Sequence, residues 1–197
     1  MTAPPPPLLL LGCGILQKEI RFLIDKNGWQ LQTNFLDSAL HIDFDKLSLA
    51  LTSALDCHSE SEIIVFYGSC HPQMESILNA AGTFRTAGQN CVEMLLGPDQ
   101  FSAELEQGAF FLLEEWARRW EPIVTATFGT NLKVIREIYQ GERSYILGIT
   151  TPCSGDFKAE AEEAGRLVGL PLRWMDISLD NLERVLQKAM ERRMRAA

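Results

Sequence analysis

The stretch EIIVFYGSCH, residues 62–71, decides the fold expected for this chain. Its apolar run from Ile63 to Tyr67 is rich in β-branched and aromatic residues and is far too short for a membrane span, so it predicts a buried parallel strand. The strand ends at Gly68 and is followed by Cys70 and His71, just before a helical segment. In parallel α/β sheets, ligands collect beyond the carboxyl ends of the strands. The stretch therefore predicts a site that carries a thiol and an imidazole.

The start of the chain repeats this plan. The apolar run Leu8 to Leu11 is followed by Gly12, Cys13 and Gly14, and then by a helical segment. Strands and helices continue to alternate along the chain, which is typical of a mostly parallel sheet. Strands are expected at 8–12, 29–35, 63–67, 83–86, 144–149 and 172–175, and helices at 15–26, 45–55, 73–81, 107–120, 128–139, 157–168 and 179–193, with a capped helical turn within 88–97.

The length and composition set the expected domain organisation. The 197 residues are 46% hydrophobic and 22% charged, which suits one globular domain with a sizeable core, although two small lobes would also fit. Residues 1–7 are rich in proline and are expected to be a disordered lead-in. We therefore expect residues 8–197 to form a single α/β domain, with a mostly parallel open sheet and helices on both faces in three layers.

The charge and the cysteine content argue against several classes of partner. A net charge of −8 disfavours a nucleic-acid surface, because phosphate binding needs a basic face. The sequence has no recognisable export signal and no apolar stretch of membrane-spanning length, so a cytoplasmic protein without a membrane partner is expected. Five cysteines, an odd number, favour buried thiols, metal ligands or catalytic groups over a disulfide framework.

Three cysteines occupy equivalent places in the expected fold. Cys13 follows the first strand, Cys70 follows the central strand, and Cys91 begins a helical turn that Asn90 can cap. The helix dipole is expected to lower the pKa of the Cys91 thiol. The sequence contains no CxxC pair, phosphate-binding loop or HExxH motif, so a site depends on residues that the fold brings together.

Thiols at the tips of neighbouring strands could share one metal ion at sulfur distances of about 2.3 Å. Three thiolates with an open fourth position suit either a catalytic zinc or an iron-sulfur cluster with one non-cysteine ligand. The alternative is that each cysteine is simply a small buried hydrophobic residue. The predicted metal ligands are Cys13, Cys70 and Cys91, the candidates for a fourth ligand are His41, His71 and Cys153, and the predicted cofactor-binding residues are Gly12, Gly14, Gly68 and His41.

Two further groups of residues are expected to be structural. Cys57 and His58 lie at the opposite end of a helix from the strand tips, which favours a surface loop. The large apolar residues between Phe110 and Trp120 have helical spacing, which favours packing in the core over an exposed interface.

Several segments resemble the successive blocks of one family. They are CGILQKEI at Cys13, LHIDFDKL at Leu40, YGSCHP at Tyr67, NCVEMLLG at Asn90 and FFLLEEW at Phe110. In this order, over about residues 8–120, they are similar to the blocks of the uncharacterised bacterial and archaeal family catalogued as domain of unknown function 1638; the last third matches only loosely.

The resemblance carries expectations about residues and function. The chain departs from the family pattern at His71 and Glu115, where the family usually has glycine. Family members are often encoded near corrinoid-dependent methyltransferases, so the resemblance implies a role around methyl transfer or its metal cofactors. The residues that the resemblance assigns to the family pattern are Cys13, Leu40, His41, Tyr67, Gly68, Cys70 and Cys91.

Three functions remain open from the sequence. The first is a zinc or iron-sulfur protein of corrinoid or one-carbon metabolism, with corrinoid methyltransferase components as partners and a small-molecule substrate. The second is a metal-free thiol enzyme with Cys70 or Cys91 as nucleophile and His41 or His71 as base. The third is a non-catalytic binding or scaffold protein that uses the aromatic stripe as a partner surface.

Overall fold

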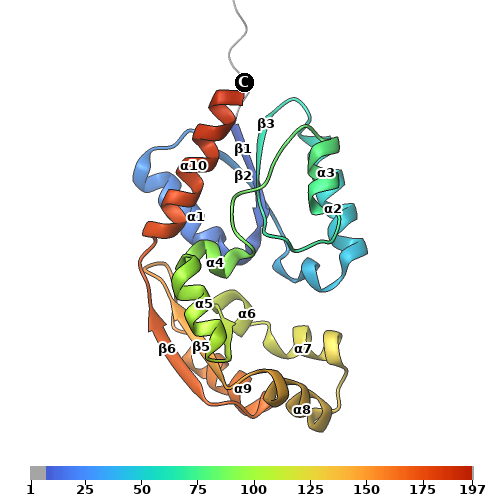
Figure 1. The fold of residues 1–197 in the computed structure, drawn as a ribbon, viewed down its shortest axis with the longest axis vertical. Helices are drawn as coiled ribbons and strands as arrows, with labels where there is room; N and C mark the ends of the chain where they lie inside the picture. The colour runs from blue at the N-terminus through green and yellow to red at the C-terminus, as the bar shows by residue number, and fades with distance from the viewer. Residues whose placement is uncertain (1–7, 197) are drawn as a thin grey trace, which may run out of the picture. The chain divides into compact units, whose positions relative to one another are not determined.

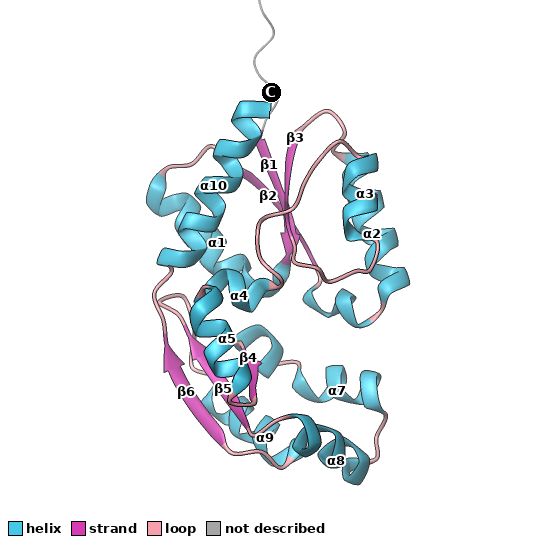
Figure 2. Ribbon diagram, viewed as in Figure 1, coloured by secondary structure: helices cyan, strands magenta, loops and turns pink. Residues whose placement is uncertain are grey.

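Two separate parallel sheets organise the chain. The computed structural model describes residues 8–196, and the lead-in predicted for residues 1–7 lies outside them. Within the described residues, the strands form two three-stranded sheets with the orders β2-β1-β3 and β4-β5-β6, drawn in magenta in Figure 2. The chain divides into two compact units, one that runs to Leu95 and resumes at Asp180, and one that comprises Leu96–Leu179. The α/β class with parallel strands is confirmed, but the strands are shared between two sheets.

The first unit encloses its sheet between helices. The inner strand β1 and its neighbour β3 are almost entirely buried, as expected of apolar runs in a parallel sheet. Figure 1 shows α1 and α10 on one face of this sheet and α2 and α3 on the other. The elements are β1 (Leu8–Cys13), the 3-10 turn η1 (Gly14–Leu16), α1 (Gln17–Asn27), β2 (Gln32–Leu36), the 3-10 turn η2 (Ser38–Ile42), α2 (Phe44–Cys57), β3 (Glu62–Phe66), α3 (Met74–Ala80), α4 (Cys91–Leu96) and α10 (Asp180–Ala196).

Local sequence explains where the helices of this unit begin and end. Helix α1 ends at Gly28, whose φ of 64° is the left-handed conformation that glycine adopts without strain. Helix α2 begins after Asp43, whose carboxylate accepts a hydrogen bond from the Lys46 amide at 3.1 Å. The segment predicted as a strand at 83–86 is extended beside β3 but makes only a single bridge, between Val65 and Arg85.

The second unit has its own sheet and core. Its core gathers aliphatic residues with Trp120, which packs edge-to-face on Phe110 and Tyr139 at ring distances of 5.2 and 5.8 Å. The prediction that the aromatic stripe is core is therefore confirmed. The elements are α5 (Pro98–Glu106), β4 (Ala109–Leu112), α6 (Glu114–Ala117), α7 (Trp120–Phe128), α8 (Leu132–Glu142), β5 (Tyr145–Thr150), α9 (Lys158–Val168) and β6 (Leu172–Asp176).

The prediction of one helix at 107–120 is wrong. Gly108, with a φ of 84°, separates α5 from β4, and Ala109–Leu112 then pairs with β5 as a parallel strand. The apolar residues of this segment are consecutive, which suits a buried strand, and the aromatic residues of helical spacing are divided between β4, α6 and α7. Among residues 8–196, no helix combines the length and apolar character that crossing a bilayer needs.

Candidate functional site

The carboxyl ends of β1 and β3 bring Cys13 and Cys70 to the same edge of the first sheet. Gly12 pairs with Phe66 in the parallel register, so Cys13 lies beside the residue that follows, Tyr67. The Cys13 side chain is buried, whereas Cys70 is partly exposed. This edge is the place at which a parallel sheet binds its ligands.

Close backbone packing at Gly68 brings Cys91 to the same edge. A Cβ added to Gly68 would lie 2.1 Å from the Gln89 carbonyl oxygen and 2.5 Å from the Asn90 Cα, so only glycine allows this approach. The Ser69 amide donates a hydrogen bond of 2.7 Å to the same Gln89 oxygen. The chain therefore reaches α4 directly beside the tip of β3.

The start of α4 has the predicted cap. The Asn90 Oδ1 accepts a hydrogen bond of 3.0 Å from the Glu93 amide, as a helix N-cap does. Cys91 is the first residue of α4 and is buried. The prediction that Asn90 caps this turn is confirmed.

The three thiols influence one another electrostatically. The pKa of the Cys91 thiol lies well above its usual value, first because it shares a hydrogen bond with the Cys13 thiol, and then because of burial and the neighbouring Cys13 and Cys70 charges. The pKa of Cys70 is also raised, mainly by burial and further by Cys13. The fold thus brings Cys13, Cys70 and Cys91 together.

The expectation that the helix dipole lowers the pKa of Cys91 is wrong. Helix α4 has only six residues, and the thiol is enclosed next to two other thiols. Burial and like charge both disfavour the thiolate, and they outweigh the backbone hydrogen bond that favours it. Without a metal, Cys70 and Cys91 are therefore protonated thiols at neutral pH.

We expect the metal-free protein to lose stability as the pH rises above about 9. The fold raises the Cys91 pKa above its ordinary value of 9.0, so the thiol of the unfolded chain loses its proton first. Alkali therefore favours the unfolded state, by up to about 1.4 kcal/mol per pH unit for one thiol, until the pH passes the raised pKa. Urea unfolding of the metal-free protein measured over this range checks the prediction. Cys91→Ser should flatten the dependence, and the same slope in that variant would contradict it.

The thiols are close but are not arranged around a vacant metal position. Across residues 8–196, no group of three or more histidine, cysteine, aspartate or glutamate side chains has a geometry that could hold a metal ion. Metal binding at this cluster therefore requires its side chains to rotate, with Cys91 giving up its hydrogen bond to Cys13.

The hydrogen bonds of His71 and His41 give the two imidazoles different chemistry. The His71 Nδ1 accepts a hydrogen bond of 2.9 Å from the Gln73 amide, so the ring proton lies on Nε2, which can then only donate. The His41 Nδ1 lies 2.7 Å from the Ser38 carbonyl, which can only accept, so its lone pair lies on Nε2. A metal-binding histidine typically donates a hydrogen bond from its second ring nitrogen in this way. The roles of His41 and His71 as fourth ligand or base stay predictions.

The remaining two cysteines, Cys153 and Cys57, belong to other elements of the structure. Cys153 belongs to the second unit, in the turn after β5, where its amide donates a hydrogen bond of 3.1 Å to the Thr151 hydroxyl. Cys57 is exposed at the end of α2, as predicted. Its neighbour His58 contacts the Asn34 amide at 3.1 Å.

The predicted cofactor-binding glycines contact the protein itself. A Cβ at Gly12 would meet Phe66 at 3.0 Å, and a Cβ at Gly14 would meet the Leu36 carbonyl oxygen at the same distance. With Gly68 against Gln89, all three glycines permit close packing around the strand ends. Their cofactor-binding role, and that of His41, stays a prediction.

The Tyr67 hydroxyl is a feature of the site that sequence reasoning missed. The side chain is 1% exposed, and its Oη has no hydrogen-bond partner among residues 8–196. Burial raises its pKa far above the usual range, and charge on Cys13, Cys91 and Cys70 adds to this effect. The signal in the sequence was a phenol at the end of an otherwise apolar strand, because a buried tyrosine hydroxyl usually has a partner.

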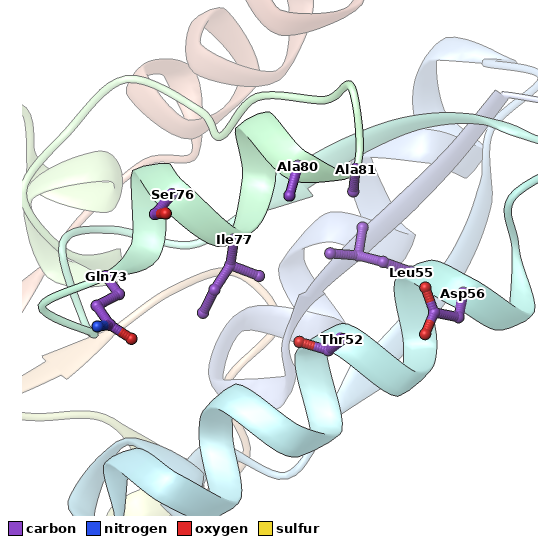
Figure 3. Close-up of a pocket in the computed structure, with 8 residues that line it drawn as sticks. All are labelled: Thr52, Leu55, Asp56, Gln73, Ser76, Ile77, Ala80 and Ala81. Atoms are coloured by element: carbon purple, nitrogen blue, oxygen red, sulfur yellow. The ribbon is translucent and has the colours of Figure 1, made fainter.

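A separate open pocket of about 380 Å³ lies between α2 and α3. Figure 3 shows that Thr52 and Asp56 of α2 and Ser76 and Ile77 of α3 line it. The described residues around this pocket include neither cysteine nor histidine, so the thiol cluster is the candidate for chemistry.

Comparison with known proteins bears on the family resemblance. A family model described as protein of unknown function (DUF1638) matches residues 35–186. The match includes His41, Cys70 and Cys91, leaves out the segment around Cys13, and extends through the last third, where the resemblance was loose. No curated protein matches the chain significantly. Because the model matches more than half of the sequence, the chain belongs to the DUF1638 family.

Proposed function

We propose that Cys13, Cys70 and Cys91 bind a metal ion through three thiolates, in a protein that acts in or beside corrinoid or one-carbon methyl transfer. The observation that carries the proposal is the meeting of three thiols from two strand ends and one helix start, two of which share a hydrogen bond. His41, whose Nδ1 lies 2.7 Å from the Ser38 carbonyl, is the proposed fourth ligand. The resemblance described above supports corrinoid methyltransferase components as partners in a reducing, cytoplasmic setting.

Of the two metal centres, a single zinc ion is the first candidate. Two sulfurs that lie about 2.3 Å from one tetrahedral metal are separated by about 3.8 Å. The Cys13 and Cys91 thiols share a hydrogen bond, so these two side chains are neighbours in the fold. In a four-iron cluster, each cysteine binds a different iron, so the cysteine sulfurs must lie farther apart than around a single ion. A cluster is therefore the second candidate.

The charges around the thiols are compatible with a bound cation and its ligands. Three thiolates and one divalent ion carry a net charge of −1, which is costly to bury without a nearby cation or donor. Arg85 lies close enough to Cys70 to favour its thiolate. The Arg85 guanidinium is fixed by hydrogen bonds to the Gly88 carbonyl at 2.7 Å and to Glu75 at 2.6 Å.

The chemistry of such a site suits methyl transfer to sulfur. A zinc ion keeps a coordinated thiol deprotonated and nucleophilic at neutral pH. The cluster orients the ion at the sheet edge, and the partial exposure of Cys70 leaves access for a small-molecule thiol. The net charge and the composition support neither nucleic acid nor a membrane as the partner.

The metal-free alternatives have less support. A nucleophilic cysteine needs a lowered thiol pKa, whereas the pKa values of Cys70 and Cys91 are both raised. A scaffold that uses the aromatic stripe would need that stripe on the surface, and Trp120 is 3% exposed.

The metal and acid-labile sulfide contents of protein purified without oxygen test the proposal. We expect about one zinc per chain, no sulfide and no colour. Iron with sulfide and a broad absorbance at about 400 nm would instead assign a cluster. If the protein held no metal and bound none on addition, the proposed function would be wrong.

A further inference from the structure

The Tyr67 hydroxyl is placed to serve a ligand. It is buried at the strand end next to Cys13, and it has no hydrogen-bond partner among residues 8–196. Leaving a hydroxyl buried and unpaired costs about 1–3 kcal/mol, so such groups are rarely kept without a partner. The thiols are near enough for charge on all three to act on the phenol.

The phenol keeps a hydrogen to donate in this place. Burial and the neighbouring thiols raise its pKa far above the usual range, so it stays protonated at any physiological pH. A neutral phenol donates its hydrogen to an atom with a lone pair, and the bond is stronger when that atom carries negative charge. Asp37, the nearby carboxylate that acts on Tyr67, likewise favours the neutral form.

We propose that the Tyr67 hydroxyl donates a hydrogen bond to an anionic ligand atom, a thiolate sulfur or a hydroxide oxygen, that completes the coordination of the metal held by Cys13, Cys70 and Cys91. This inference rests on the proposed function and names a positioning residue and the class of its ligand. A fourth anion would bring the net charge of a divalent site to −2. A donor beside that anion offsets part of the cost of burying it.

The experiment uses the full chain loaded with Co²⁺, whose absorbance reports thiolate ligation, and compares wild type with Tyr67→Phe. Both proteins should load with Co²⁺ and show thiolate charge-transfer bands. Titration with 2-mercaptoethanol should then give binding that is about 10- to 100-fold weaker in Tyr67→Phe, as expected for loss of a hydrogen bond to a charged group. A pH titration without added thiol covers the other source of the ligand, because loss of the bond should raise the pKa of the bound water in the variant.

The outcomes separate the inference from the proposed function. If Tyr67→Phe binds 2-mercaptoethanol more weakly than wild type, the ligand atom that accepts from Tyr67 is a thiolate sulfur. If the two proteins differ only in the pH titration, that atom is a hydroxide oxygen. If Tyr67→Phe loads Co²⁺ and alters neither titration, the role of Tyr67 is overturned while the metal site stands. If wild type does not bind Co²⁺ at all, both are overturned.

A stability measurement without metal provides an independent check. Because the Tyr67 hydroxyl is unpaired, metal-free Tyr67→Phe should have a Tm equal to or above that of wild type. Tyr145→Phe is the matched control, since the Tyr145 hydroxyl donates a hydrogen bond of 2.6 Å to Glu104. That variant should lose stability and leave the Co²⁺ titrations unchanged. A lower Tm in Tyr67→Phe would show that the hydroxyl has a structural partner, which overturns the inference.

Discussion

Replacing Cys13, Cys70 or Cys91 singly by serine is expected to abolish metal loading in each case. The three thiols meet at one edge of the sheet, and a serine hydroxyl is a poor ligand for zinc because it is not ionised at neutral pH. Loss of an outer partner of a metal ligand already costs about 10- to 100-fold in affinity, so loss of a thiolate should cost more. Zinc titration against a competing chelator measures the affinity of each variant.

The matched control is Cys57→Ser. Cys57 is an exposed cysteine of the same unit at the end of α2, and its replacement should leave the affinity unchanged. Loss in all three cluster variants and none in the control is the expected pattern. Unequal and independent losses among Cys13, Cys70 and Cys91 would mean that they do not share one ion.

The pH dependence of metal affinity provides a second test of the same site. Cys70 and Cys91 have raised pKa values and are protonated before the metal binds, so their binding as thiolates releases about two protons. The affinity should therefore rise by about 100-fold per pH unit near neutrality from these two thiols, and by up to about 1,000-fold where Cys13 releases a proton as well. For each thiol that is not a ligand, the change in metal affinity per pH unit would be about tenfold smaller.

Local sequence patterns were sufficient for the part of the site that lies on strands. The apolar runs before Cys13 and Cys70 predict parallel strands, and parallel strands present their carboxyl ends at one edge. The Asn90 cap is likewise a local signal, because a cap depends on residues three positions apart. The meeting of Cys13 and Cys70 could thus be expected from sequence.

The remaining features depend on contacts between distant residues. The pKa of Cys91 is set by enclosure beside Cys13, which no pattern around residue 91 reveals. The unpaired Tyr67 hydroxyl is visible only when its surroundings are known. The division into two sheets depends on which strands pair, and the strand sequences by themselves do not specify this pairing. The different hydrogen bonds of the His71 and His41 Nδ1 atoms also become visible only in the structure.

Gly68→Ala is expected to destabilise the protein by about 3 kcal/mol and to remove metal binding with it. The added methyl carbon would lie 2.1 Å from the Gln89 oxygen, and this neighbour is backbone that cannot rotate away. The loop before α4 must therefore move, which breaks the 2.7 Å hydrogen bond from Ser69 and withdraws Cys91 from the other thiols. Urea unfolding and zinc titration of the same samples measure both effects.

Gly141→Ala separates this steric effect from the general effect of adding a methyl group. Gly141 lies in α8, and a Cβ added there has no neighbour within 4 Å. Alanine is a better helix former than glycine, so this variant should be as stable as wild type or more stable by up to about 1 kcal/mol. If Gly68→Ala kept wild-type stability and zinc affinity, close packing at Gly68 could not be what places Cys91 beside Cys13 and Cys70. If it lost stability but kept the affinity, the loop would hold Cys91 in place by other contacts, and the cluster would tolerate movement of the backbone that leads into it.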